Sequence, residues 1–137
     1  MRCLFSFKAI MPALVMMFSV SANADNMKVM LAKYELGNAL TKLGLLTDSF
    51  TERGKQSPSI AGANAAEEMA STLDQFIANG LQHNASCEKI QEVANSKIAE
   101  MYEGQAKDSS GAVKKAIGGV KGAMRNYVET QCSNLSE

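Results

Sequence analysis

The fold is decided by residues 110–132, which read SGAVKKAIGGVKGAMRNYVETQC. Apolar side chains recur in this stretch every three or four residues, the spacing that places them on one side of an α-helix. They are Val113, Ile117, Val120, Met124, Tyr127 and Val128. The stretch therefore predicts an amphipathic helix. Gly118, Gly119 and Gly122 lie in its interior, where each costs about 1 kcal/mol relative to alanine. On the far side from the stripe, Gly118 and Gly122 would let another backbone approach closely.

A second helix is predicted from about Ser86 to Glu103, immediately upstream. Its apolar face consists of Cys87, Ile90, Ala94, Ile98 and Met101, and its opposite face of Glu88, Glu92, Glu100 and Glu103. Cys87 opens this helix and Cys132 closes the next one. In an antiparallel hairpin these two ends lie side by side, within the ~4.4 to 6.8 Å between Cα atoms that a disulfide requires. We therefore expect a Cys87–Cys132 disulfide.

A long helix is predicted near the N-terminus, from about Asn26 to Arg53, with Asp25 as its cap. Its apolar residues follow a seven-residue repeat. One set of positions holds Val29, Leu36, Leu43 and Phe50, and the other Ala32, Ala39 and Leu46.

A further helix is predicted after a stretch rich in Pro, Gly and Ser from Gly54 to Gly62. Asn64 is its expected cap, with Glu67 three residues on in a capping box, and Asn79-Gly80 is its expected end. The inner stripe comprises Ala66, Met69, Ala70, Leu73, Phe76 and Ile77, whereas Glu67, Glu68, Asp74 and Gln75 point away from it.

No stretch alternates apolar and polar residues in the way that indicates a β-strand. The sequence therefore predicts an all-α fold, a small antiparallel (up-down) four-helix bundle with one disulfide.

Residues 1–24 have the composition of a secretory signal peptide. Arg2 and Lys8 precede an apolar stretch from Ala9 to Val20. Ala22-Asn23-Ala24 then supplies the small residues of a cleavage site. We expect cleavage after Ala24, a single helical domain over residues 25–137, and a periplasmic or secreted location. Cys3 would be lost with the signal, which leaves two cysteines to pair in an oxidising compartment.

The charges are balanced in number but not in position. The chain has 14 basic and 14 acidic residues, and without residues 1–24 the counts are 12 and 14, which argues against a nucleic-acid partner. Residues 59–103 carry a net charge of −5 and residues 104–128 one of +4. We expect the lysines of residues 110–132 to pair with the acidic helix before them. Candidate partner-binding residues are Glu67, Glu68, Asp74, Glu88, Glu92, Glu100, Glu103, Lys114, Lys121 and Arg125.

The sequence offers no catalytic set and no cofactor motif. His83 is the single histidine, so a metal site built from His83, Cys87, Cys132 and Glu88 is disfavoured against a disulfide. The stretch from Gly118 to Gly122 lacks the Lys-Ser/Thr ending of a phosphate loop, and no serine lies in a G-x-S-x-G motif. We expect neither a metal, a cofactor nor an enzymatic activity.

Binding of another protein outside the cytoplasm is the function that these features favour. Small exported helical domains with a disulfide resemble, in architecture alone, periplasmic immunity proteins and inhibitors of cell-wall enzymes. One alternative is an accessory or pilus-associated subunit of a secretion or conjugation system. Another is a membrane-surface protein acting through the cationic residues Lys114, Lys115, Lys121 and Arg125, which is less favoured because the apolar stripe beside them is needed for the core.

Overall fold

The computed structural model describes residues 26–47, 57–107 and 109–136, and within them the fold is all-α with no strand. A first helix covers residues 26–46. It is followed by α2 (Pro58–Gln82), α3 (Cys87–Met101), α4 (Glu103–Lys107) and α5 (Gly111–Ser136). The described ranges therefore hold five helices rather than the four expected, because the short α4 fills the connection between α3 and α5.

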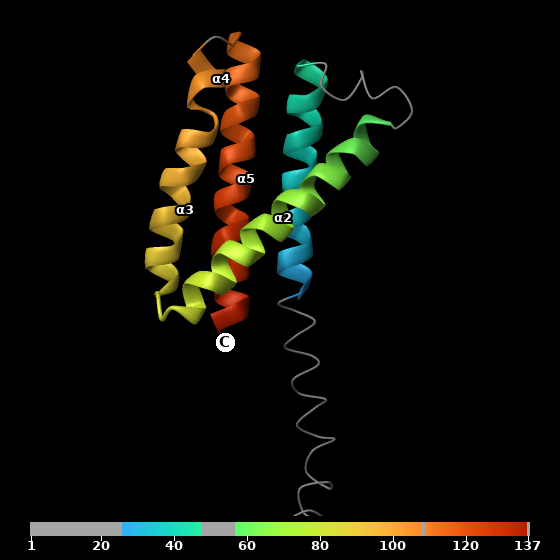
Figure 1. The fold of residues 1–137 in the computed structure, drawn as a ribbon. Helices are drawn as coiled ribbons and strands as arrows, with labels where there is room; N and C mark the ends of the chain where they lie inside the picture. The colour runs from blue at the N-terminus through green and yellow to red at the C-terminus, as the bar shows by residue number, and fades with distance from the viewer. Residues whose placement is uncertain (1–25, 48–56, 108, 137) are drawn as a thin grey trace, which may run out of the picture.

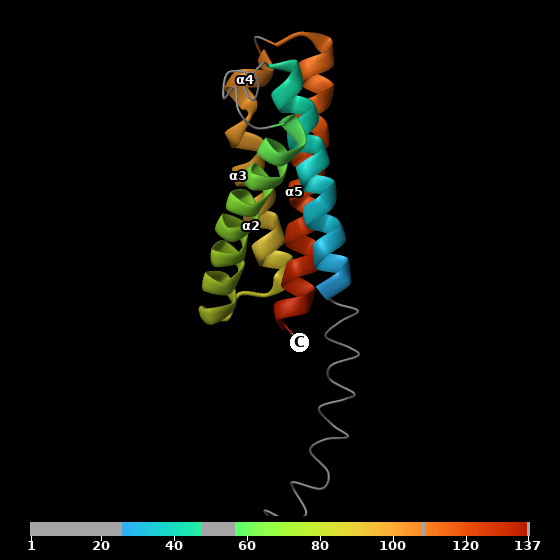
Figure 2. The same ribbon diagram turned by 90° about the vertical axis from the view of Figure 1, so that its right-hand side faces the viewer.

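Successive long helices run in alternating directions (Figures 1 and 2). α3 and α5 lie side by side, whereas α2 crosses the helix of residues 26–46 and α5 obliquely (Figure 1). One core joins the four long helices, and its largest fully buried side chains include Leu36, Ile77, Ile98 and Tyr127, one from each helix.

The stripe predicted on α5 forms the centre of this core. Ile117, Val120, Met124, Tyr127 and Val128 are each at most 1% exposed, and Val113 packs against the cluster. The inner stripe predicted on α2 is confirmed in part: Ala66, Ala70, Leu73 and Ile77 are buried, whereas Met69 and Phe76 are half-buried.

The predicted disulfide between Cys87 and Cys132 is confirmed. The two Cα atoms lie 5.8 Å apart, so the bond ties the first residue of α3 to the C-terminal end of α5. At the opposite end of the pair, the chain itself connects the two helices through α4.

The predicted start and end of α2 are wrong. The helix begins at Pro58, six residues before Asn64, because Ser57 supplies the cap: its Oγ accepts a hydrogen bond from the Ile60 N–H at 3.3 Å. Proline at the first helical position needs no amide donor and is already set at a helical φ. Asn79-Gly80 does not end the helix, which continues to Gln82 and is capped by His83.

Three smaller expectations also differ from the structure. Leu46 is 43% exposed and Leu40 is buried in its place, because a straight helix of 3.6 residues per turn drifts away from a strict seven-residue repeat. α3 ends at Met101 instead of Glu103, and Met101 is 61% exposed. Phe50, the end of the first helix at Arg53 and the signal peptide over residues 1–24 lie outside the described residues.

Glycines set the oblique course of α2. A Cβ on Gly62 would lie 1.8 Å from Thr41 Oγ1 and 3.0 Å from the Gly37 carbonyl oxygen. At Gly62, α2 therefore crosses the helix of residues 26–46 so closely that a larger residue would clash. At the other end of α2, a Cβ on Gly80 would lie 2.8 Å from Ile90 Cγ1, so α2 and α3 also approach closely there. The course of α2 is therefore fixed at two points, one against each neighbour.

Candidate functional site

A groove opens between α2 and α3. The two helices converge where Gly80 meets Ile90, and further along they diverge because α2 turns toward the helix of residues 26–46 (Figure 1). The resulting cavity has a volume of about 410 Å³. It is lined by Ala65, Glu68, Met69, Thr72, Leu73, Phe76, Ala94, Lys97, Ile98, Met101 and Met124.

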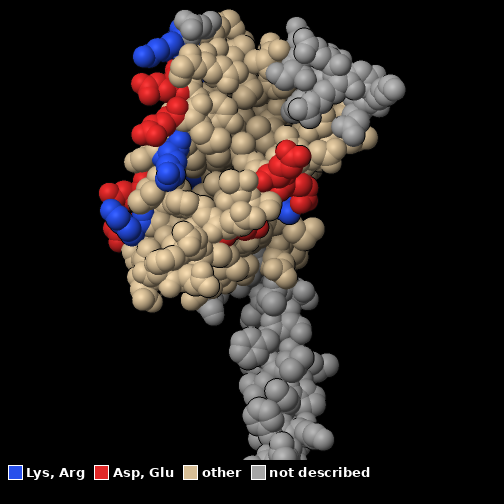
Figure 3. Space-filling model, in the orientation of Figure 1, with Lys and Arg blue, Asp and Glu red and all other residues tan. Residues whose placement is uncertain are grey.

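The lining of this groove is almost entirely apolar. Figure 3 shows the hollow on a largely uncharged face, with the charged side chains gathered along its edges. Met124 of α5 forms part of the floor and is 1% exposed, whereas Met101 on the rim is 61% exposed. Methionine side chains are flexible and polarisable, and surfaces rich in them adapt to the apolar side chains of partners. The groove can therefore accept apolar groups without a matching rigid shape.

One acidic and one basic side chain face this groove from opposite walls. Glu68 belongs to α2 and Lys97 to α3, and both are exposed. Among the described residues, ion pairs join Lys33 to Glu67 and Lys89 to Glu92, and neither Glu68 nor Lys97 takes part in one. Both charges are therefore free to pair with groups of a bound molecule.

The structure brings only some of the predicted partner-binding residues together. Glu68 lines the groove, while Glu67 is exposed beside it and pairs with Lys33 of the first helix at 3.3 Å. Glu88 and Glu92 are exposed at the start of α3. Elsewhere, Glu100, Glu103, Lys114 and Lys121 line a separate hollow of about 660 Å³. Arg125 is exposed on α5 and lines neither.

The prediction that α5 lysines form ion pairs with the acidic face of α3 is wrong. Within the described ranges no ion pair joins α3 to α5. Lys114 and Lys121 share a hollow with Glu100 and Glu103, but no lysine nitrogen there lies within 4.0 Å of a carboxylate oxygen. The two helices are held by apolar packing and the disulfide instead.

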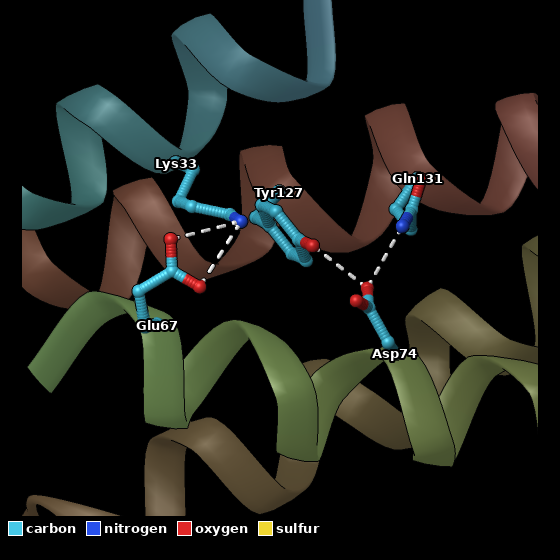
Figure 4. Close-up of polar contacts among 5 residues, drawn as sticks. All are labelled: Lys33, Glu67, Asp74, Tyr127 and Gln131. Carbon is cyan, nitrogen blue, oxygen red and sulfur yellow. Dashed lines mark hydrogen bonds and ion pairs between the residues drawn. The ribbon is translucent and has the colours of Figure 1, made fainter. Parts of the chain in front are cut away.

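Asp74 does not point away from the core as predicted. Its Oδ1 accepts hydrogen bonds from the Tyr127 hydroxyl at 2.7 Å and from Gln131 Nε2 at 2.9 Å (Figure 4). Tyr127 is 1% exposed, so its hydroxyl needs a partner inside the protein. Asp74 therefore joins α2 to α5 through its Oδ1 atom.

The same cluster shifts the pKa of Tyr127. Burial of the ring raises the pKa of the phenol above its ordinary value, and the hydrogen bond to the Asp74 carboxylate raises it further. The phenol thus stays protonated and donates to Asp74. Burial also raises the pKa of the Tyr102 phenol.

The exposed side of α5 carries the glycines. A Cβ added at Gly118, Gly119 or Gly122 would meet no heavy atom within 4 Å, so no other part of the described chain approaches there. The apolar stripe on the other side of α5 is fully used by the core. None of the helices in the described ranges combines the length and apolarity needed to cross a membrane.

No metal site is formed by the described residues. None of their His, Cys, Asp and Glu side chains gather in groups of three or more that could hold an ion. The Nδ1 atom of His83 lies 2.8 Å from the Asn79 carbonyl oxygen, and the nearby Cys87 is in the disulfide.

Met69, Phe76 and Met101 belong to the stripes that the sequence predicts to be buried. The structure leaves Met69 and Phe76 half-buried and Met101 exposed, because the oblique α2 does not cover the upper part of α3. The signal for this lies in small residues rather than in periodicity: Gly62 sets where α2 crosses the first helix, and Gly80 where it meets α3.

No family model, curated protein or solved structure matches this chain. The geometry of the groove and the charges on its rim are therefore the basis for assigning a function.

Proposed function

We propose that the chain is an exported helical protein that binds another protein in the cell envelope or the extracellular space. In this proposal it acts as an immunity protein or inhibitor of an envelope-acting enzyme or toxin, and the partner docks in the groove between α2 and α3. The single observation that carries the proposal is the groove itself. Its cavity of about 410 Å³ is mostly apolar and lies open at the surface, and each wall has a charge that forms no ion pair with any described residue.

The composition of the groove favours a protein partner. Met69 and Met101 are flexible anchors at the surface, and Phe76 adds an aromatic contact, the types of residue that are enriched in protein interfaces. Apolar side chains of the partner would occupy the floor, while Glu68 and Lys97 would orient it through charge-assisted hydrogen bonds.

The scaffold supports this role. In the same proposal the helix of residues 26–46, α2, α3 and α5 form one up-down bundle. The disulfide holds α3 against α5, so one wall of the groove is fixed to its floor. A rigid site binds with a smaller loss of conformational entropy than a mobile one.

Export is part of the proposal. Residues 1–24 are assigned as a signal peptide cleaved after Ala24, and the Cys87–Cys132 bond is of the kind that persists in oxidising compartments. Mass spectrometry of the exported protein should show a chain that begins at Asp25 and is two hydrogens lighter than its reduced form. A chain that retains Met1 would contradict cleavage after Ala24, and free thiols at Cys87 and Cys132 would contradict the oxidised form.

Docking is tested by filling the groove. Thr72 is exposed and lines the groove, whereas the neighbouring Ser71 is also exposed but lies outside the lining. We expect the wild-type protein and Ser71→Trp to capture the same partner from an envelope extract of the native host after chemical cross-linking. The amount of that partner captured by Thr72→Trp should be at least tenfold lower. Equal capture by the two tryptophan variants would place the partner elsewhere.

A further inference from the structure

The first helix carries apolar residues on two opposite sides. Ala32, Leu36, Leu40 and Leu43 face the core, and Met27, Met30, Leu31 and Tyr34 are 69%, 67%, 58% and 67% exposed. With 3.6 residues per turn, the centre of the exposed set lies about 180° around the helix from the centre of the buried set. We call these four exposed residues the outer stripe. Apolar residues on the outward face of a helix indicate a further contact.

The spacing of the outer stripe is symmetric. Positions 27, 30, 31 and 34 are separated by three, one and three residues, so the pattern is the same in both directions along the helix. A two-fold axis between residues 30 and 31 would set Met27 against Tyr34 of a second copy, and Met30 against Leu31 of that copy. A surface that matches itself in this way is what a two-fold dimer requires.

The charges beside the outer stripe have the same symmetry. At 100° per residue, Lys28 and Glu35 lie on one flank of the stripe. In an antiparallel pair about the same axis, Lys28 of each chain would lie beside Glu35 of the other, offset by about 3 Å along the helices. Lys28 forms no ion pair among the described residues, and Glu35 accepts one long hydrogen bond, from Asn126 at 3.4 Å. Both groups are therefore available for pairing.

We propose that the protein forms a two-fold symmetric dimer in which the outer stripes of two copies pack antiparallel and Lys28 pairs with Glu35 of the second copy. This contact uses none of the residues that line the groove between α2 and α3. It therefore stands or falls independently of the proposed partner.

The dimer is tested by sedimentation equilibrium of the protein purified after export, at 1 to 200 µM. The expected average mass rises with concentration toward twice that of one chain. Leu31→Lys, next to the two-fold axis, should stay monomeric over this range. Leu45→Lys is the matched control: Leu45 is 47% exposed and faces the same side of the helix, but it lies about 22 Å along the helix from the two-fold axis, beyond the first residue of the second copy's helix, so this variant should dimerise like the wild type. Unchanged circular dichroism would show that both variants fold.

Charge reversal tests the antiparallel arrangement. Lys28→Glu and Glu35→Lys should each raise the dissociation constant by about two- to thirtyfold, the effect expected for losing two exposed ion pairs per dimer. The double variant Lys28→Glu/Glu35→Lys should restore the wild-type value. The proposal is overturned if the wild type is monomeric at 200 µM, if Leu31→Lys dimerises as well as Leu45→Lys, or if the double variant does not recover. A monomer that sediments with phosphatidylglycerol vesicles would instead assign the outer stripe to a lipid surface.

Discussion

At the scale of single residues, Asp74 and Tyr127 make the polar contact that holds α2 on α5. The hydroxyl of a fully buried ring must be satisfied, and the Asp74 carboxylate does this at 2.7 Å while also accepting from Gln131. The helical wheel places Asp74 on a polar side of α2. It cannot show that α5 passes close to that side, so the role of Asp74 emerges only from the packing.

Tyr127→Phe should lower the free energy of unfolding at pH 7 by about 1.5 to 3 kcal/mol, the range for a hydrogen bond to a charged group. The difference should shrink above pH 10. Burial and Asp74 raise the pKa of Tyr127 in the folded protein above the ordinary 10.0, so at high pH the unfolded chain releases this proton and the folded one retains it. The stability contributed by Tyr127 is thus full below pH 10 and is lost as the pH rises beyond it. Urea unfolding of both proteins at pH 7 and pH 11 measures this, and a difference that is the same at both values would contradict it.

At the scale of helices, glycines have opposite roles in α2 and α5. Gly62 lies in a close helix crossing, where a Cβ would come within 1.8 Å of Thr41 Oγ1. Gly118 faces open space, where a Cβ would meet nothing within 4 Å. The same substitution should therefore change stability in opposite directions at the two positions.

Gly118→Ala should raise the free energy of unfolding by about 0.5 to 1 kcal/mol, because alanine is the better helix former and loses less chain entropy on folding. Gly62→Ala should lower it by about 1 to 3 kcal/mol, because the crossing helices must separate. Thermal unfolding followed by circular dichroism compares both with the wild type. A stabilising Gly62→Ala would mean that α2 does not cross at this point.

Periodicity in the sequence was sufficient where a helix has one buried face. Most of the stripe on α5 and four of the six residues of the inner stripe on α2 are buried as the periodicity predicts, and the cysteine positions predict the α3–α5 pairing. The predicted start of α2 is wrong because proline and glycine are typical of loops, whereas here Ser57 caps the helix and Pro58 occupies its first position, where proline is favourable.

The groove could not be predicted from periodicity. It exists because α2 touches α3 near Gly80 and lies further from α3 toward its own N-terminus. The angle between two helices depends on side chains that are distant in sequence, such as Thr41 and Ile90. Charge alone does not distinguish Glu68, which lines the groove, from the other acidic candidates, which do not.

At the scale of the whole molecule, the disulfide closes a loop of 45 positions around α3, α4 and α5. The chain-entropy model gives a stabilisation of roughly 4 kcal/mol for a loop of this length. Replacing both Cys87 and Cys132 by serine should therefore lower the free energy of unfolding by up to about 4 kcal/mol, measured by urea unfolding. Because α3 is one wall of the groove, partner capture should weaken as well. A double variant as stable as the wild type would show that apolar packing alone holds α3 against α5.

The methionines offer the most direct test that the groove is the docking site. Met69, Met101 and Met124 line it, whereas Met27 and Met30 lie on the outer stripe. Methyl NMR of protein labelled with ¹³C-methyl methionine, recorded with and without the captured partner, reports on both surfaces at once. We predict that the signals of Met69, Met101 and Met124 shift on binding while those of Met27 and Met30 stay in place. Shifts confined to Met27 and Met30 would contradict docking in the groove.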